Sequence, residues 1–451
     1  MKLGLTIAAL GAALLIYSQT WAFAWDEGFH LLAAQLITRG RHPYGDFLFA
    51  QPPLNAYWNA LLVRVFGPAW RPSHFAAAIE TLAAVWLMAG FVRRRMGDRY
   101  AICAAILAGL NVEVFQFGSI AQPYGICMLF SATAFRLAVS GCAFAAGIAS
   151  GAAASASLLS APVGPVLLVW IAARQRSFRD AVPFVWGGLV GFIPVLWALA
   201  KWPKQTWFDL VGFHVHYRQA QWSDWPAHDF AVVTSWLNSA QGFVLLGLTL
   251  VGLFSLRRAR PEFQLCGCLA VGLAVFVAAG HPTFPQYFSL AVPFAAVIAV
   301  VGLERIGFGR IAVSVVIAVT CAGLVRMLVD SGDETRWADF RELVQTVDRV
   351  TPPGAALYAD EQIYFLTGRM PPAGLEWSSG HKVEIPLASA RSLHLIPQSE
   401  LDREVRRGTF ATLETCYESE IDRLGLRKIY SQEKRDDDCF VFWDKRSDRK
   451  G

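Results

Sequence analysis

The sequence predicts a polytopic α-helical membrane protein with a small soluble domain at its C-terminal end. Of 451 residues, 55% are hydrophobic and only 17% are charged, a balance that excludes an ordinary soluble domain. Long uncharged runs fill residues 1–330, whereas charged residues gather in 331–451. The net charge of +5 is small. Most basic residues of the apolar part lie in short clusters between hydrophobic runs, so we expect no nucleic-acid partner.

A membrane-crossing helix needs a continuous run of mainly apolar residues. About twenty residues suffice, and by this criterion the chain has about eleven candidate spans. They are 3–24, 73–92, 100–117, 121–139, 142–158, 161–173, 182–200, 233–256, 264–280, 286–303 and 311–329. The pair 142–158 and 161–173 is short. It could instead form one broken or re-entrant segment around Ser160-Ala161-Pro162.

Arginine clusters follow every second span and predict the orientation. They are Arg93, Arg94, Arg95 and Arg99, then Arg136, then Arg174, Arg176 and Arg179, then Arg257, Arg258 and Arg260, then Arg305 and Arg310. Basic residues favour the cytoplasmic side, and a cytoplasmic N-terminus puts all of these clusters there. We therefore predict an inner- or plasma-membrane protein with long outer loops at 25–72 and 201–232. Counting the short pair as one span would break this agreement.

Residues 331–451 predict a small extracytoplasmic α/β domain. Residues 337–347 have helical periodicity and end at Thr351-Pro352-Pro353-Gly354. Short β-like runs follow at 355–358, 363–366, 427–430 and 439–443. Cys416 and Cys439 both fall in this domain, where a disulfide is permitted. Sequence alone does not decide whether they pair.

The first outer loop carries the most informative motif. Trp25-Asp26-Glu27-Gly28 stands directly behind the first span, and carboxylates at a membrane edge are costly unless they are solvated or paired. Pro43-Tyr44-Gly45-Asp46-Phe47 and then Gln51-Pro52-Pro53-Leu54 follow in the same loop. An alternative is that the acidic pair only caps the helix that begins there.

In these blocks the chain resembles the GT-C membrane glycosyltransferases, with the protein O-mannosyltransferase and aminoarabinose-transferase types (families 39 and 83) nearest in pattern. Two weaker matches are Ala121-Gln122-Pro123-Tyr124-Gly125 and the segment from His281-Pro282 to Gln286-Tyr287-Phe288. The resemblance implies a GT-C-like fold over residues 1–330. It also implies transfer of a hexose or pentose, with inversion, from a polyprenyl-phosphate-linked donor at the outer face. The acceptor would be a glycan, a lipid or a protein.

The resemblance and the chemistry together nominate site residues. Asp26 is the candidate base that takes the acceptor's proton, and Glu27 is its catalytic neighbour, expected to orient the loop. Candidate substrate-binding residues are Tyr44, Asp46, Gln51, Tyr57, Tyr124, Lys201, His216, Arg218, His281 and Tyr287. We predict no cofactor. A divalent metal is possible but not indicated, because His214-x-His216, read as part of a strand, lacks a third ligand.

Two departures from the resembled pattern keep other functions open. Many relatives carry Lys or His where Gln51 stands, and often Arg where Gln122 stands, so phosphate binding must depend on other residues. One alternative is a transporter or flippase of lipid-linked sugars, which predicts ionisable residues within the spans. Another is a non-catalytic envelope assembly protein.

Overall fold

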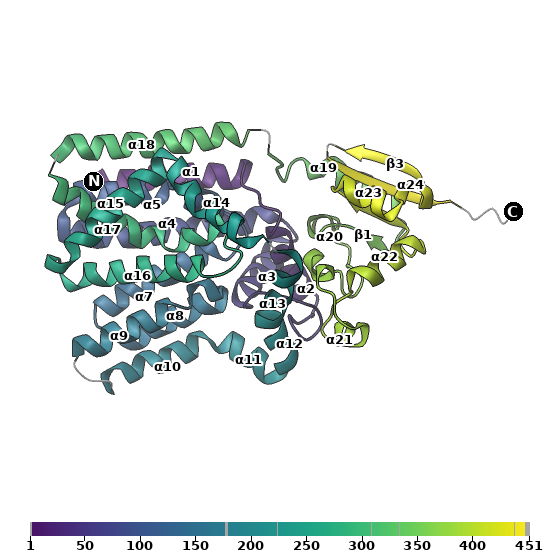
Figure 1. Ribbon diagram of the computed structural model, residues 1–451, viewed down its shortest axis with the longest axis horizontal. Helices are drawn as coiled ribbons and strands as arrows, with labels where there is room; N and C mark the ends of the chain where they lie inside the picture. The colour runs from purple at the N-terminus through teal and green to yellow at the C-terminus, as the bar shows by residue number, and fades with distance from the viewer. Residues whose placement is uncertain are drawn as a thin grey trace.

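The computed structural model describes residues 2–175, 179–222, 224–307, 309–332, 334–436 and 438–446. A bundle of long helices forms one end of the molecule, and a small sheet domain covers the other end (Figure 1). The helices α2 and α3 and the run α11–α13 lie between the two parts (Figure 1). The segment between helix bundle and sheet domain is therefore built largely from the two long loops of the sequence.

The first half of the helical part contains two long helices, α1 and α4, among shorter ones. Its elements are α1 (Lys2–Thr20), α2 (Glu27–Thr38), α3 (Leu54–Phe66), α4 (Trp70–Met96), α5 (Asp98–Gly109), α6 (Val112–Phe117), α7 (Tyr124–Val139), α8 (Ala143–Ala156), η1 (Leu158–Ser160) and α9 (Val163–Gln175). The second half comprises η2 (Arg179–Ala181), α10 (Val182–Gly191), α11 (Ile193–Lys201), α12 (Pro203–Trp207), η3 (Phe208–Gly212), α13 (Phe213–Gln221), α14 (Trp225–Asn238), α15 (Ala240–Ser255), η4 (Leu256–Arg258), α16 (Pro261–Ala278), η5 (Pro285–Leu290), α17 (Val292–Ile306) and α18 (Gly309–Asp330).

Several of these helices are long and apolar enough to cross a membrane. Within the described residues α1, α4, α16 and α18 qualify alone, and the bent pairs α10–α11 and α14–α15 qualify as two further broken spans. α7, α8 and the segment 158–174 are apolar but shorter. Helices occupy the predicted span ranges, but the count of eleven is not confirmed. The polytopic helical class is confirmed, and the chain is an integral membrane protein.

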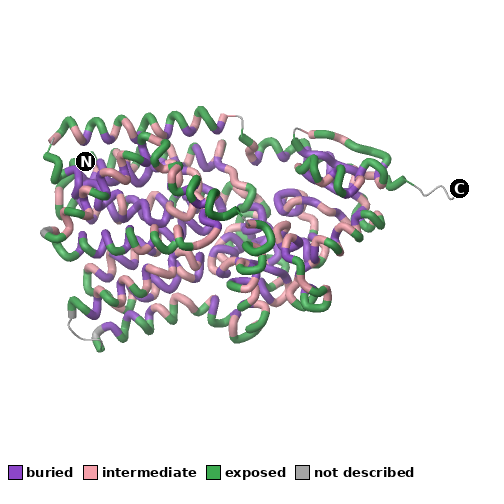
Figure 2. Tube along the Cα trace, in the orientation of Figure 1, coloured by how far each residue is buried: buried purple, intermediate pink, exposed green. Residues whose placement is uncertain are grey.

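Exposed apolar side chains mark the surface that faces lipid. Phe254 on α15 is 86% exposed, and Ile311 on α18 is 76% exposed. Turns of α18 and α10 at the margins of the bundle are mostly exposed or intermediate, whereas the central helices are buried (Figure 2). A helix that is apolar on its exposed face needs an apolar solvent, which fits a bilayer.

The short helices α8 and α9 are separate elements, and α8 packs closely on α10 through glycines. A Cβ on Gly147 or Gly151 of α8 would lie 2.0 or 2.2 Å from a backbone oxygen of α10, and one on Gly187 of α10 would lie 2.0 Å from α8. Small residues at such contacts allow the close helix approach typical of membrane proteins. α8 therefore packs on α10 along its length, while α9 begins after the turn at η1.

The C-terminal sheet domain has four strands in the order β1-β2-β4-β3. β1 (Leu357–Tyr358) runs parallel to β2 (Thr412–Thr415), and β4 (Cys439–Lys445) is antiparallel to β2 and to β3 (Tyr430–Asp436). Its helices are α19 (Phe340–Val350), α20 (Glu361–Thr367), η6 (Ser378–Lys382), α21 (Leu387–Ser392), α22 (Gln398–Arg406), α23 (Glu418–Leu424) and α24 (Leu426–Ile429). Cys416 and Cys439 form a disulfide that joins the end of β2 to the start of β4.

Two of the predicted strands are wrong. Residues 363–366 lie in helix α20, and 427–430 lie mostly in α24, with β3 beginning only at Tyr430. A run of four apolar residues does not separate a strand from a buried helix by periodicity alone. The strand β2 was not predicted, because Thr412–Thr415 mixes polar residues into a position that the fold buries completely.

Candidate functional site

The loop between α1 and α2 presents two neighbouring carboxylates in different surroundings. Asp26 occupies the N-cap position of α2, where a carboxylate commonly accepts a hydrogen bond from the first turn. Its side chain makes no such bond. Glu27 begins the helix and is completely buried. Asp26 therefore does not cap the helix through a side-chain hydrogen bond.

Glu27 joins four segments that are far apart in the sequence. Its Oε1 accepts hydrogen bonds from Ala24 N at 3.2 Å and from Trp337 Nε1 at 2.8 Å. Its Oε2 accepts from His74 Nε2 at 2.6 Å and from Ala121 N at 3.0 Å. An ionised carboxylate offers roughly four lone-pair sites, and these four donors use them. Glu27 thus holds the loop together and lines neither of the cavities described below.

His74 is the side chain packed directly against the Glu27 carboxylate. Its Nδ1 lies 2.8 Å from Ser18 O, its Nε2 lies 2.6 Å from Glu27 Oε2, and the ring is fully buried. Both ring nitrogens thus face oxygen atoms, and the ring links the first loop to α1 and α4.

The sheet domain also fixes the loop that carries Asp26. Gln362 on α20 donates from Nε2 to Trp25 O at 2.6 Å. A Cβ on Gly28 would lie 2.6 Å from the side-chain amide carbon of Gln362, so only glycine fits at the end of the Trp-Asp-Glu-Gly motif. The next residue, Phe29, stacks on Trp377 with ring centres 4.1 Å apart. The position of Asp26 therefore depends on the sheet domain as well as on α1.

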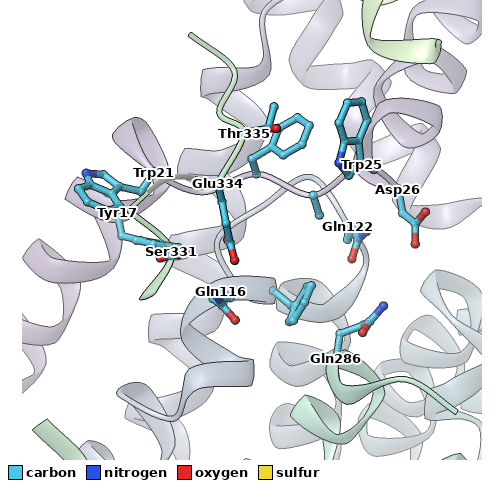
Figure 3. Close-up of a pocket in the computed structure, with 13 residues that line it drawn as sticks. Tyr17, Trp21, Trp25, Asp26, Gln116, Gln122, Gln286, Ser331, Glu334 and Thr335 are labelled. Atoms are coloured by element: carbon cyan, nitrogen blue, oxygen red, sulfur yellow. The ribbon is translucent and has the colours of Figure 1, made fainter. Parts of the chain in front are cut away.

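Asp26 lies where two cavities meet. The first, here called the amide cavity, has a volume of about 590 Å³ and is lined mainly by glutamines, aromatic rings and the connector that follows α18 (Figure 3). The second, here called the apolar cavity, has a volume of about 430 Å³ and is lined mainly by aliphatic and aromatic groups from η1, η3, α13 and α16. Asp26, Gln122 and Gln286 line both. A group bound in either cavity can thus reach the same carboxylate.

The surroundings of Asp26 favour its protonated form more than water does. Its side chain is open to the cavities, yet protein surrounds it on most sides. Burial raises the pKa of the carboxyl above its usual range, and the ammonium of Lys382 on η6 opposes this rise. A raised carboxyl pKa is typical of a general base that works near neutral pH.

The apolar cavity contains one permanent cation among its described lining residues, Arg218 of α13. Two histidines line it without adding charge. Burial lowers the pKa of His30 to about 3, and it also lowers the pKa of His214, whose Nε2 donates to Ala50 O at 2.8 Å. Any anionic group in this cavity is therefore matched chiefly by Arg218.

Gln51 lines the apolar cavity, and the first loop holds it rigidly. The Tyr44 hydroxyl donates to Gln51 O at 2.6 Å, and Tyr44 is buried with a φ of 67°. Next to it, a Cβ on Gly45 would lie 2.4 Å from the Trp202 indole. The loop that delivers Gln51 is thus fixed from within and by the start of the second long loop.

The second long loop contains a π-helical turn in η3, next to the residues that hydrogen-bond to the first long loop. Hydrogen bonds in such a turn span five residues, and these turns occur often at functional sites. Asp209 accepts from Phe49 N at 2.8 Å, and His214, five residues later, donates to the next carbonyl. Arg218 follows one α-helical turn after His214, on the same face. The π-turn therefore brings the two loop contacts and the cavity arginine into one row.

Comparisons with known proteins give structural matches only. No family model matches the chain, and no curated protein matches it. The structure of ArnT from Cupriavidus metallidurans bound to undecaprenyl phosphate is 15% identical, with a TM-score of 0.70 and 97% of each chain covered. Its apo state also gives 0.70. The Archaeoglobus fulgidus oligosaccharyltransferase tethered with an acceptor peptide is 13% identical, with a TM-score of 0.54 over 91% of this chain and 68% of its own.

Both proteins are GT-C glycosyltransferases. The chain has the GT-C fold. The match to ArnT spans the helical part and the sheet domain together, because it covers nearly all of both chains. The predicted GT-C-like fold with a small C-terminal sheet domain is confirmed.

The GT-C fold brings five of the predicted site residues together around the apolar cavity. They are Asp26, Gln51, Tyr124, Arg218 and Tyr287. They come from five separate elements between α2 and η5, which explains why no single motif in the sequence contains them.

The other predicted site residues lie outside the two cavities. They are Glu27, Tyr44, Asp46, Tyr57, Lys201, His216 and His281. The Asp46 carboxylate closes its own turn by accepting from His42 N at 2.7 Å. The Nδ1 atom of His281 lies 2.6 Å from Asp229 Oδ2, beside the turn that carries Gln286.

Several residues at the site were not nominated from the sequence. Gln116 lines the amide cavity without any charge or motif to mark it, Gln286 lines both cavities from a weak motif match that gave it no role, and Glu334 lies in a short connector. Lys382 comes from η6, which is distant in sequence from the first loop. His30 follows Asp26 by one helical turn, and this spacing on α2 was the one available signal.

No metal centre is indicated around Asp26 by the described residues. His214 and His216 lie in helix α13 and not in a strand, so two residues of spacing point them to different faces. The described residues contain one cluster with metal-ligand spacing, Glu414 with Cys416 and Cys439, and its two sulfurs form the disulfide.

Proposed function

We propose that this chain is an inverting membrane glycosyltransferase. It moves a hexose or pentose from a polyprenyl-phosphate-linked donor to an acceptor hydroxyl, with Asp26 as the general base. The observation that carries the proposal is the position of Asp26 between two cavities of different chemistry. A transferase must hold two unlike substrates against one proton acceptor, and this arrangement does so.

The apolar cavity suits the donor. Its aliphatic walls, among them Leu159, Leu210 and Val215, match a polyprenyl chain, and Arg218 matches the phosphate. The bound undecaprenyl phosphate of ArnT, a protein of the same fold, supports this choice of lipid. The ammonium of Lys382, on η6 of the sheet domain, acts electrostatically on Asp26. It supplies a second positive charge that the uncharged Gln51 does not.

The reaction is a single displacement. Asp26 takes the proton of the acceptor hydroxyl as its oxygen attacks the anomeric carbon of the sugar. The bond from that carbon to the phosphate oxygen breaks, and its electron pair leaves with the polyprenyl phosphate. Arg218 and Lys382 stabilise the negative charge that grows there. One displacement at one carbon inverts its configuration.

The chemistry takes place on the extracytoplasmic side. The arginine clusters support a cytoplasmic N-terminus, and the disulfide of the sheet domain fits an oxidising compartment. In this arrangement residues 1–330 form the catalytic membrane module, and residues 331–451 form an outer domain that covers the site.

The test compares the Asp26→Asn variant with the wild-type protein, both full-length and reconstituted in proteoliposomes. The donors are undecaprenyl phosphates that carry labelled hexoses or pentoses, and the measurements are label transfer and undecaprenyl phosphate release. We expect a loss of about 10²–10⁴ in rate, the usual contribution of a general base. Transfer at the wild-type rate by the variant would refute the assignment.

Asp348→Asn is the matched control, because Asp348 makes an ion pair on the surface of the sheet domain. It should transfer normally. A parallel assay of lipid translocation distinguishes the transferase from the main alternative, a flippase. Translocation of the labelled lipid without any sugar transfer would identify a flippase.

A further inference from the structure

The amide cavity has the chemistry of a carbohydrate site. Gln116 of α6, Gln122 of the loop before α7 and Gln286 of η5 line it together. Gln122, Gln286 and Glu334 point into the cavity, and Asp26 lies at one end of it (Figure 3). Each amide both donates and accepts hydrogen bonds, as sugar hydroxyls do.

Gln122 needs a hydrogen-bond donor that the protein does not provide. Its side chain is only 5% exposed, and its buried Oε1 has no partner among the described residues. An orphaned buried acceptor is destabilising, so a ligand that donates to it binds more tightly. A hydroxyl or an amine can donate there, whereas an ionised phosphate or carboxylate cannot.

The charged groups that line the amide cavity are acidic. Asp26 and Glu334 line it, and its described lining residues include no Lys or Arg. Two cations act from outside this lining. The Lys382 ammonium acts on Asp26 from the sheet domain, and the Arg336 guanidinium lies over the Trp21 ring at 4.0 Å, with Nη2 donating to Gly332 O at 2.7 Å. Like charges placed together repel, so the two lining carboxylates disfavour an acceptor bearing phosphate or carboxylate.

The remaining walls are aromatic. Tyr17, Trp21, Trp25 and Phe117 line the cavity, and ring faces carry the negative side of an aromatic quadrupole. The C–H faces of a sugar ring and amine groups both pack well on such faces. The volume of about 590 Å³ also exceeds what one serine or threonine side chain fills.

Building on the proposed function, we propose that the acceptor is a neutral or amine-bearing saccharide held in the amide cavity, with Gln122, Gln286 and Glu334 selecting it over anionic acceptors. A hydroxyl of this saccharide faces Asp26, and its other hydroxyls pair with the amides. The apolar cavity, with Arg218, takes the anionic partner, so the two cavities separate substrates by charge.

The test uses the full-length protein in lipid nanodiscs. It is given one lipid-linked sugar that it uses as a donor, together with matched oligosaccharide acceptors. The acceptors are neutral, amine-bearing, phosphorylated or uronic-acid-bearing. We expect neutral and amine-bearing acceptors to have kcat/KM at least about tenfold above the anionic ones, given the cost of like charges. Equal or better use of the anionic acceptors would overturn the inference.

Charge variants of the exposed Glu334 give the second measurement. Glu334→Gln and Glu334→Lys should shift the preference stepwise toward phosphorylated acceptors. Glu304→Lys, which makes the same charge change near the far end of α17, should not. An unchanged preference in Glu334→Lys would overturn the role of this carboxylate.

Failure of the inference and failure of the proposed function are distinguishable. Without an acceptor, water can take its place, give its proton to Asp26 and attack the anomeric carbon, which releases free sugar and undecaprenyl phosphate. This slow hydrolysis of the donor, with its loss in Asp26→Asn, reports on the proposed function alone. If that release is present and anionic acceptors have the higher kcat/KM, only the saccharide inference fails. Quenching of tryptophan fluorescence by neutral saccharides should also occur without donor, since Trp21 and Trp25 line the cavity.

Discussion

Replacing Glu27 with glutamine separates a structural carboxylate from a catalytic one. A glutamine has one carbonyl oxygen and one NH₂ group, so in either orientation its NH₂ faces two donors that Glu27 now satisfies. Two of the four hydrogen bonds are lost, and the buried donors that made them are left without a partner. Each such donor typically costs about 1–3 kcal/mol. We expect a loss of that order, a large part of the usual stability of a domain.

The assay is thermal unfolding of purified protein followed by tryptophan fluorescence, with limited proteolysis at the connector that holds Trp337. Glu27→Gln should unfold at a lower temperature and expose the connector to protease. Glu342→Gln is the matched control, because Glu342 makes an exposed ion pair with Lys434. It should change neither measurement.

The result that would refute this reasoning is specific. If Glu27→Gln unfolds at the wild-type temperature, resists protease and yet loses transfer, then Glu27 acts in the chemistry and not through the four segments it joins. The same measurements on Asp26→Asn should give the opposite pattern, with normal stability and lost transfer.

Three further outcomes are expected. Activity should fall as pH drops through the raised pKa of Asp26, and Lys382→Met should move this acid limb to higher pH in a pH–rate profile, because the ammonium lowers that pKa. Burial raises the pKa of Asp209 well above its usual range, so the neutral Asp209→Asn should keep normal donor KM, while Asp209→Ala should raise it. Reduction of the Cys416–Cys439 disulfide should lower the unfolding temperature of the sheet domain, since such bonds commonly contribute about 2–4 kcal/mol.

Sequence patterns predicted the parts of the fold that depend on composition. Apolar runs located the helices of the bundle, and the block around Asp26 pointed to a carboxylate that lines two cavities. They did not predict the chain's path where short apolar runs are ambiguous, as at 363–366, where α20 replaces a strand. Nor did length alone give the number of spans, because α10–α11 bends by 61° at a break followed by Pro194.

The site was predictable only where one residue carries the chemistry. Gln51 was recognised as a missing cation, but the electrostatic effect of Lys382 on Asp26 could not be foreseen, since it depends on the placement of the sheet domain. Gln116 lies in no motif, and Gln286 lies in a weak motif match that gave its amide no role. Tyr44 was expected at the substrate, whereas it acts one step away by holding the Gln51 carbonyl.

The two cavities share part of their lining, because Asp26, Gln122 and Gln286 belong to both. A substitution at one of these residues therefore changes both cavities. Substitutions chosen to change the acceptor will also change the donor KM, and the two substrates should show thermodynamic coupling in binding. It also favours sequential kinetics, in which both substrates occupy the protein before the first product leaves, so initial-rate plots should intersect and not run parallel.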